Sequence, residues 1–146
     1  MFRKLRPEDR NTFLEMTRDF YSSPAVLHPI PEENHEALFE ELMRSGDYVE
    51  CFIIEQDGQI AGYAQISKTY SHEAGGSVVW LEELYVVPQF RGKGLGGKFL
   101  DELTRSFPAA RFRLETEPEN LAAAALYRRH GFKPLSYVQY VIDKKQ

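Results

Sequence analysis

EELYVVPQFRGKGLGG, residues 82–97, is the stretch that decides how this chain folds. An apolar strand ends at Pro88, a loop with four glycines follows, and a helix-like stretch begins directly after the loop. Glycines let the backbone approach a ligand closely, and the free N–H groups at a helix N-terminus attract negative charge. Arg91 and Lys93 add positive charge at the same place. The stretch therefore predicts a binding site for a ligand that carries phosphate.

Two other phosphate motifs nearly match the loop. Gly92, Gly97 and Lys98 fit the spacing of the phosphate loop of ATPases and GTPases. That motif needs Ser or Thr at the next position to hold magnesium, and this chain has Phe99 there. The glycines also fit the dinucleotide fingerprint, which follows its strand directly and opens a long run of strand–helix units. Here residues 88–91 separate the strand from the first glycine and too little chain remains, so both motifs are disfavoured.

NLAAAALYRRHGF, residues 120–132, is a second motif. Together with the glycine loop it resembles the GNAT acetyltransferase superfamily, whose members transfer an acyl group from coenzyme A to an amine. The Arg/Gln-x-x-Gly-x-Gly/Ala loop of that family is met by Arg91, Gly94 and Gly96. Its second signature is met by Asn120, Ala123, Leu126, Tyr127, Gly131 and Phe132. The resemblance is specific over residues 77–132, and before them only the order of the elements matches.

The resemblance implies an α+β fold in a single domain over residues 1–146. Its central sheet is expected to be mixed and mostly antiparallel, with about six to seven strands flanked by about four helices. Apolar periodicity and turn residues place strands at 2–5, 48–55, 59–70, 77–87, 111–117 and 137–142. They place helices from Pro7, at 32–44, after the glycine loop, and from Asn120 to Gly131. By resemblance, the sheet splays between strands 77–87 and 111–117, and the pantetheine arm of the cofactor lies in that gap.

Composition narrows the class of protein. The chain has 146 residues, of which 42% are apolar, so it can bury the core of one domain. No apolar run is long enough for a membrane helix and the N-terminus lacks a signal-peptide core, so no membrane partner is expected. A net charge of −4 disfavours nucleic acid as a partner. Cys51 is the one cysteine, which fits the reducing cytoplasm where we expect the protein to lie.

Acetyl transfer from a thioester to an amine needs a neutral amine and a proton for the leaving thiolate. An alkylammonium has a pKa near 10.4, so at pH 7 under about 0.1% is free base and a carboxylate is the expected base. Tyr127 lies two helical turns after Asn120, so both occupy one side of the helix. By resemblance, Tyr127 donates a proton to the sulfur and Asn120 bonds the pantetheine arm. Asn120 is also a natural N-cap, and Tyr127 also fits a core aromatic position.

Three glutamates are candidates for the base, in the order Glu82, Glu115 and Glu83. Adjacent residues of a regular strand face opposite sides, so Glu82 and Glu83 share a side only if a bulge interrupts the strand. Two carboxylates are unusual in a strand that is otherwise so apolar. By resemblance, Glu82 matches an acidic position at the amine in polyamine-type acetyltransferases. Glu115 matches a base position in ribosomal-protein N-acetyltransferases.

The expected cofactor contacts follow the glycine loop. The splay leaves backbone groups of residues 84–86 unpaired, so they are expected to bond the cofactor. The amides of residues 92–97 are expected to hold its pyrophosphate, with Arg128 or Lys98 near the phosphate of the nucleotide. The predicted cofactor-binding residues are Leu84, Tyr85, Val86, Arg91, Gly92, Lys93, Gly94, Leu95, Gly96, Gly97 and Asn120.

The leading hypothesis is an N-acetyltransferase that uses acetyl-CoA and a primary amine on a small molecule, peptide or protein. The alternative is a non-catalytic acyl-CoA-binding module that senses the cofactor or regulates a partner. The histidines and Cys51 have no metal-ligand spacing, so no metal is expected. His28, in the proline-rich loop of residues 22–31, is a candidate to line the acceptor pocket. Phe20, Tyr21 and Tyr70 are further candidates for its walls, and they also fit core positions. A homodimer is a possible assembly, because dimers are common in the superfamily.

Overall fold

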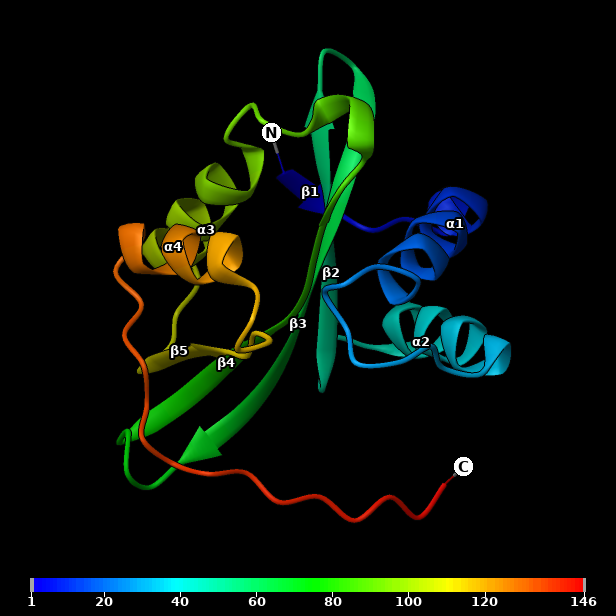
Figure 1. The fold of residues 1–146 in the computed structure, drawn as a ribbon. Helices are drawn as coiled ribbons and strands as arrows, with labels where there is room; N and C mark the ends of the chain where they lie inside the picture. Colours follow the sequence, from blue (N-terminus) through cyan, green and yellow to red (C-terminus); the bar gives the residue numbers. More distant parts are fainter. Residues whose placement is uncertain (1, 146) are drawn as a thin grey trace.

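The computed structural model describes residues 2–145 and shows a five-stranded sheet between two pairs of helices (Figure 1). The strands are β1 (Phe2–Lys4), β2 (Val49–Gln56), β3 (Gln59–Ser71), β4 (Gly76–Val86) and β5 (Arg111–Leu114). The helices are α1 (Arg10–Tyr21), α2 (Glu32–Arg44), α3 (Leu95–Ser106) and α4 (Leu121–Arg129), with 3-10 turns η1 (Pro7–Asp9) and η2 (Pro88–Phe90). Strand order follows chain order: β1 to β4 pair antiparallel, and β5 is parallel to β4.

The sheet carries a packed core on each face. α1 and α2 cover one face, where Phe13 and Tyr63 are fully buried (Figure 1). α3 and α4 cover the other face, where Ile66 and Leu100 are fully buried. α3 contributes apolar residues at helical spacing, whereas α4 has no fully buried residue. One side of α4 therefore stays available to line a cavity rather than a core.

β4 contains a bulge at Glu82, and this irregularity shapes the site. Residues 65 and 66 of β3 pair with residues 83 and 81 of β4, so Glu82 has no partner in β3. Leu81 and Leu84, three positions apart, consequently pack into the same core beside α3. β5 pairs with β4 only over Val78–Leu81, so the two strands diverge from the bulge onward. The predicted splay of the sheet is therefore confirmed.

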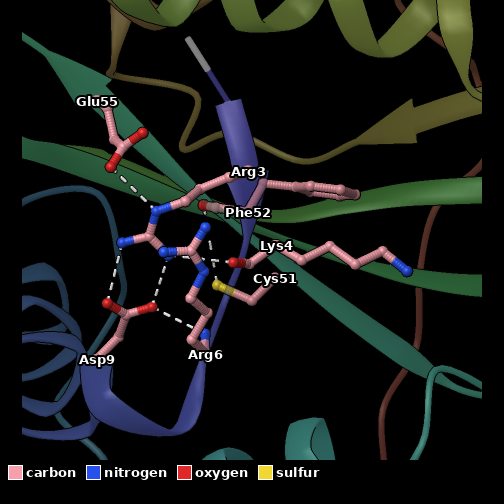
Figure 2. A network of polar contacts seen from close by, with 7 residues as sticks. All are labelled: Arg3, Lys4, Arg6, Asp9, Cys51, Phe52 and Glu55. Carbon is pink, nitrogen blue, oxygen red and sulfur yellow. Dashed lines mark hydrogen bonds and ion pairs between the residues drawn. The ribbon is translucent and has the colours of Figure 1, made fainter.

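An ion pair fastens the first strand to the first helix (Figure 2). Arg3 of β1 donates two hydrogen bonds to Asp9, at 2.8 and 3.0 Å, and one to Glu55 at 3.0 Å. Asp9 also accepts the backbone N–H of Arg6 at 2.8 Å, which closes the turn η1. Asp9 is 5% exposed, and its hydrogen bonds with Arg3 lower the pKa of its carboxyl. The network fixes the start of α1 against the sheet.

The structure confirms a mixed, mostly antiparallel sheet with four helices, but it corrects the number of strands to five. Residues 137–142, expected to be the last strand, pair with no strand within the described residues. Their sequence alternates as a strand should, but a strand also needs a neighbour for its backbone groups. β5 ends at Leu114 rather than at residue 117, because β4 has diverged beyond the bulge. The first helix opens with the 3-10 turn η1, so α1 itself begins at Arg10.

Candidate active site

A cavity of about 820 Å³ opens where β4 and β5 diverge, and we call it the main cavity. One wall is β4 from Leu81 to Val86, and the facing wall is residues 115–118 with part of α4. Residues 25–30, between α1 and α2, and the glycine loop with the start of α3 complete the lining. Ligand pockets typically enclose about 300–1,000 Å³, so the main cavity has the size of a binding site.

The glycine loop gives the main cavity a site for an anion. Gly92 and Gly94 have φ angles of 79° and 75°, a region that favours glycine, and the space beside each is open. Gly94 is the N-cap of α3, and no side chain caps that helix end. Residues 94–97 all line the cavity. The first N–H groups of α3 lack intrahelical acceptors, so this helix end is suited to phosphate.

The basic side chains of the loop make specific contacts of their own. Arg91 lines the main cavity, donates from Nε to the carbonyl of Val86 at 2.7 Å, and lies 5.5 Å from the ring centre of Tyr85. It therefore ties the loop to the end of β4. The Lys93 ammonium lies 5.4 Å from the ring centre of Phe90. Lys93 is not among the residues that line the cavity.

α4 presents Asn120 and Tyr127 to the main cavity. Asn120 Oδ1 accepts the N–H of Ala123 at 3.1 Å, which confirms its N-cap role. Tyr127 is half-buried with its ring centre 6.1 Å from that of Phe132, and burial raises the pKa of its hydroxyl. A raised pKa keeps the phenol protonated at neutral pH. Tyr127 is therefore in the right protonation state to donate a proton.

Glu82 and Glu115 lie on facing walls of the main cavity. Glu82, the exposed bulge residue, accepts a hydrogen bond from the Ser67 hydroxyl at 2.5 Å. Glu115 lies just beyond β5 and accepts a hydrogen bond from the side chain of Gln139. Glu117 adds a third carboxylate to the lining. The cavity thus combines the positive end of α3 with several carboxylates, and carboxylates attract a cationic group.

Glu83 points to the opposite face of the sheet and is 6% exposed. Its carboxylate oxygens accept hydrogen bonds from the hydroxyls of Tyr63 at 2.7 Å and Tyr21 at 2.9 Å. Burial raises the pKa of this carboxyl, and the two tyrosine bonds oppose that shift. Tyr21 also lines the main cavity. Glu83 is therefore separated from the cavity by the side chain of one tyrosine.

Most of the predicted site residues meet at the main cavity. They are Leu84, Val86, Arg91, Gly92, Gly94, Leu95, Gly96, Gly97, Asn120, Glu82, Glu115 and Tyr127. Tyr85 does not line it, because its side chain packs in the core beside α1, so only its backbone is available for the predicted cofactor bond. His28, Phe20 and Tyr21 do line it, as the sequence suggested. Tyr70 does not: near the end of β3 it is 76% exposed, so it is neither a wall of the main cavity nor a core residue. Sequence reasoning missed Glu117, although it stands two residues from the candidate Glu115.

Cys51 and the possible metal ligands form no metal cluster within residues 2–145. Cys51 is buried, and burial raises the pKa of its thiol well above the usual range, so it stays a thiol at neutral pH. Among residues 2–145, no group of three or more His, Cys, Asp or Glu side chains is placed to hold a metal ion. Over that same part of the chain, none of the helices is long and apolar enough to cross a membrane.

The sequence profile of the Acetyltransferase (GNAT) family matches residues 11–132. The chain belongs to the GNAT acetyltransferase family. It is therefore an N-acetyltransferase, and the match includes both the glycine loop and the motif at residues 120–132 that pointed to this family.

Curated proteins resemble this GNAT chain over most of their length. An uncharacterized N-acetyltransferase of Bacillus subtilis (strain 168) is 29% identical over 130 residues, which cover 86% of this chain and 83% of that protein. The thialysine N-epsilon-acetyltransferase of Mus musculus is 27% identical over 145 residues, covering 92% of this chain and 84% of that protein. Aminoglycoside N(6')-acetyltransferase type 1 of Salmonella typhimurium is 28% identical over 109 residues, covering 70% of this chain and 74% of that protein.

Solved structures share the GNAT fold at low sequence identity. An aminoglycoside N-acetyltransferase in complex with CoA has a TM-score of 0.79 and 21% identity, covering 99% of this chain and 95% of that chain. A possible acetyltransferase from Clostridium difficile 630 has a TM-score of 0.84 and 15% identity, covering 100% and 98%. These likenesses establish the fold of the chain and no more.

Proposed function

We propose that this GNAT protein transfers an acetyl group from acetyl-CoA to a primary amine on a cationic acceptor. The observation that carries the proposal is the composition of the main cavity. It joins an uncapped helix N-terminus and open glycines to the carboxylates of Glu82 and Glu115 and the hydroxyl of Tyr127. An anionic cofactor and a cationic amine need those two kinds of lining in one cavity.

Acetyl-CoA fits the residues that are present, and it supplies the activated acetyl group. Gly92 and Gly94 leave open space at positive φ, so the amides of residues 92–97 can hold its pyrophosphate. The pantetheine arm then fits the gap beyond the bulge, where residues 84–86 have no strand on the β5 side. Asn120, the N-cap of α4, lines the main cavity, which supports the proposal that it bonds the arm.

Glu82 is the proposed base. Its carboxylate removes a proton from the ammonium group of the acceptor, directly or through one water, and so frees the nucleophilic lone pair. The bulge turns Glu82 into the main cavity, whereas Glu83 faces the α1 side. Glu115, on the facing wall, is the second candidate for the base.

Tyr127 is the proposed acid. The new N–C bond forms as the C–S bond breaks, and the phenol gives its proton to the departing sulfur. The phenolate then regains a proton from the newly formed amide nitrogen or from solvent. Burial raises the pKa of the Tyr127 hydroxyl, so it holds this proton until the thiolate forms.

The acceptor is proposed to carry more than one positive charge. Glu82, Glu115 and Glu117 all line the main cavity, and several carboxylates attract a polycation more strongly than a single ammonium group. The names of two relatives specify amine acceptors, thialysine in one case and an aminoglycoside in the other. We also propose a cytoplasmic location, because the unpaired Cys51 suits a reducing compartment.

Thiol release from acetyl-CoA tests the function when each of several amines is offered in turn. The panel should contain spermidine, a 6'-amino aminoglycoside, thialysine, and peptides with a free N-terminus or a lysine. Calorimetric titration with CoA runs in parallel, and reactions without acceptor measure background hydrolysis. Release with a polyamine or aminoglycoside supports the proposal. Tight CoA binding with no release across the panel would favour the acyl-CoA sensor instead, and absence of CoA binding would contradict both.

A further inference from the structure

A chain of polar side chains runs from the main cavity into the core beneath α1 and α2. At its centre is the buried Glu83, which accepts hydrogen bonds from Tyr21 at 2.9 Å and Tyr63 at 2.7 Å. Tyr63 is hydrogen-bonded in turn to Thr17, whose hydroxyl lies 3.1 Å from Nδ1 of His35. Thr17 and His35 are buried as well. Of these residues, Tyr21 alone lines the main cavity, so the chain can act on a ligand only through Tyr21.

The hydroxyl of Tyr21 directs its proton away from the main cavity. A phenol has one proton and two lone pairs, and here the O–H donates to Glu83. Toward the cavity the oxygen can therefore act only as a hydrogen-bond acceptor. Burial and then the charge of Glu83 raise the pKa of Tyr21, so the phenol keeps its proton at neutral pH. Donation to a carboxylate also polarises the O–H group and makes its oxygen a stronger acceptor.

The ring of Tyr21 is held in place from several sides. Its centre lies 5.2 Å from the ring centre of Phe20 and 5.7 Å from that of His35, both in edge-to-face geometry. A second bond of the same kind joins α1 to β4, because Tyr85 donates to Asp19. The end of α1, and Tyr21 with it, is thereby fixed against β4.

Glu82 shares this part of the main cavity with Tyr21. Both residues line the cavity, and the charge of Glu82 adds to the rise in the pKa of Tyr21, so the two groups lie close enough to interact. An alkylammonium group has three N–H donors, which a carboxylate and a phenol oxygen can share. A carboxylate alone attracts any cation. A phenol oxygen with no proton to offer bonds only a group that carries a donor.

We propose that Tyr21 binds the ammonium group of the acceptor through its phenol oxygen, beside Glu82, and that Glu83 is a positioning residue that acts through Tyr21. The inference rests on the proposed function, because it requires an amine to enter the main cavity. The acceptor is then selected for N–H groups as well as for charge. A primary ammonium group meets both conditions, whereas a quaternary ammonium group meets only the second.

Two matched dications separate these conditions. Hexane-1,6-diamine and hexamethonium carry two positive charges on the same six-carbon chain, but only the diamine has N–H groups. Each is titrated into nitrogen-15-labelled protein saturated with CoA, which has no acetyl group to transfer. Tyr21→Phe keeps the ring and should raise the Kd for the diamine about tenfold while leaving that for hexamethonium within about twofold. Equal changes for both probes, no change for either, or a wild type that does not bind the diamine would overturn the proposal.

A double-mutant cycle tests the role of Glu83. In Glu83→Gln the amide must direct its NH2 group toward one of the two tyrosines, so the orientation of the Tyr21 hydroxyl is no longer fixed. The Kd for the diamine should rise about threefold to tenfold, and Tyr21→Phe/Glu83→Gln should bind it no more weakly than Tyr21→Phe alone. Additive losses would overturn the positioning role. Asp19→Asn is the matched control, because it removes the charge from the other tyrosine–carboxylate bond between α1 and β4.

Steady-state kinetics distinguish this inference from the proposed function. With acetyl-CoA and the diamine, Tyr21→Phe should raise the KM for the diamine about tenfold and change kcat less than about twofold. A fall in kcat at unchanged KM would make Tyr21 a proton-transfer residue and overturn its binding role. If no amine in the panel releases thiol but Tyr21 still governs diamine binding, the proposed function fails and the inference holds. Thiol release that Tyr21→Phe leaves unchanged would overturn the inference alone.

Discussion

Tyr63 and Glu83 are joined by a hydrogen bond of 2.7 Å in the interior of the sheet, where both side chains are buried. Tyr21 donates to the other oxygen of the same carboxylate at 2.9 Å. Burial raises the pKa of Glu83, and hydrogen bonds to a carboxylate act in the other direction. A carboxyl that burial pushes toward its neutral form makes the stability of the fold depend on pH.

Glu83→Gln should remove this part of the pH dependence. The pKa of Glu83 is raised in the folded protein, so its stabilising contribution is complete below about 4.5 and is lost as pH rises through the folded pKa. Urea denaturation from pH 5 to pH 8 should show the wild type losing stability relative to Glu83→Gln as pH rises. Glu40→Gln, on the exposed side of α2, is the control and should track the wild type. Parallel curves for wild type and Glu83→Gln would contradict the prediction.

Tyr127→Phe should slow turnover and leave cofactor binding intact. The variant keeps the ring that packs near Phe132 but removes the proton donor. We expect kcat to fall by about 10²-fold, as is typical for loss of a general acid. The Kd for CoA should stay within about threefold, because the ring remains and the lost hydroxyl acts on the departing thiolate. Tyr48→Phe, an exposed tyrosine outside the main cavity, serves as the control.

Glu82→Gln should lower kcat/KM by about 10²-fold or more at neutral pH if this carboxylate is the base. The loss should narrow toward pH 10, because the free amine becomes abundant without a base as pH approaches about 10.4. Glu115→Gln provides the comparison on the facing wall, and its deficit should not narrow in this way. If the loss of kcat/KM shrinks toward pH 10 in Glu115→Gln and stays constant in Glu82→Gln, then Glu115 is the base instead of Glu82.

Gly94→Ala should weaken CoA binding. Gly94 has φ of 75° at the N-cap of α3, where a side chain costs about 1 kcal/mol and the new methyl group enters the anion site. We expect the Kd for CoA to rise about tenfold by calorimetry. Gly58→Ala is a matched control, since Gly58 also has φ of 75° and open space but lies in the β2–β3 turn. Equal loss of CoA affinity in both variants would point to general destabilisation.

Asp9→Asn should destabilise the fold by about 3 kcal/mol, because it leaves the Arg3 guanidinium without its main carboxylate. Arg3 lowers the pKa of Asp9, so the stabilising contribution is present above about 3.8 and is lost as pH falls through the folded pKa. Chemical denaturation at pH 6 and pH 3 should therefore show a smaller difference in the free energy of unfolding between wild type and variant at pH 3 than at pH 6. If this difference in unfolding free energy is the same at both pH values, the charge of Asp9 is not its cause.

The family and most of the element order could be predicted from the sequence because they rest on local patterns. The glycine loop, the Asn120 N-cap and the helix of residues 32–44 are each specified by residues close in sequence, and all three are present. The splay was expected from the family resemblance and is present. The bulge in β4 was left open as a possibility, and the structure has one.

What the sequence could not specify depends on distant partners. The hydrogen bond from Tyr21 to Glu83 joins residues 62 positions apart, so no local pattern announces it. Residues 137–142 have the alternation of a strand, but pairing depends on a neighbouring edge that their own composition does not describe. The length of β5 was overestimated for the same reason, because the divergence of β4 ends it at Leu114.

The bulge in β4 shows how a strand can acquire a carboxylate that points into a cavity. With Glu82 removed, residues 81 and 83 would stand next to each other and still pair with residues 66 and 65 of β3. The alternation of Leu81, Glu83, Leu84 and Tyr85 between the two cores would be that of an ordinary strand. The cavity carboxylate is thus an insertion into a complete strand and replaces no packing residue. A sheet can in this way gain or lose a reactive side chain by a single-codon insertion or deletion while its hydrophobic cores stay in phase.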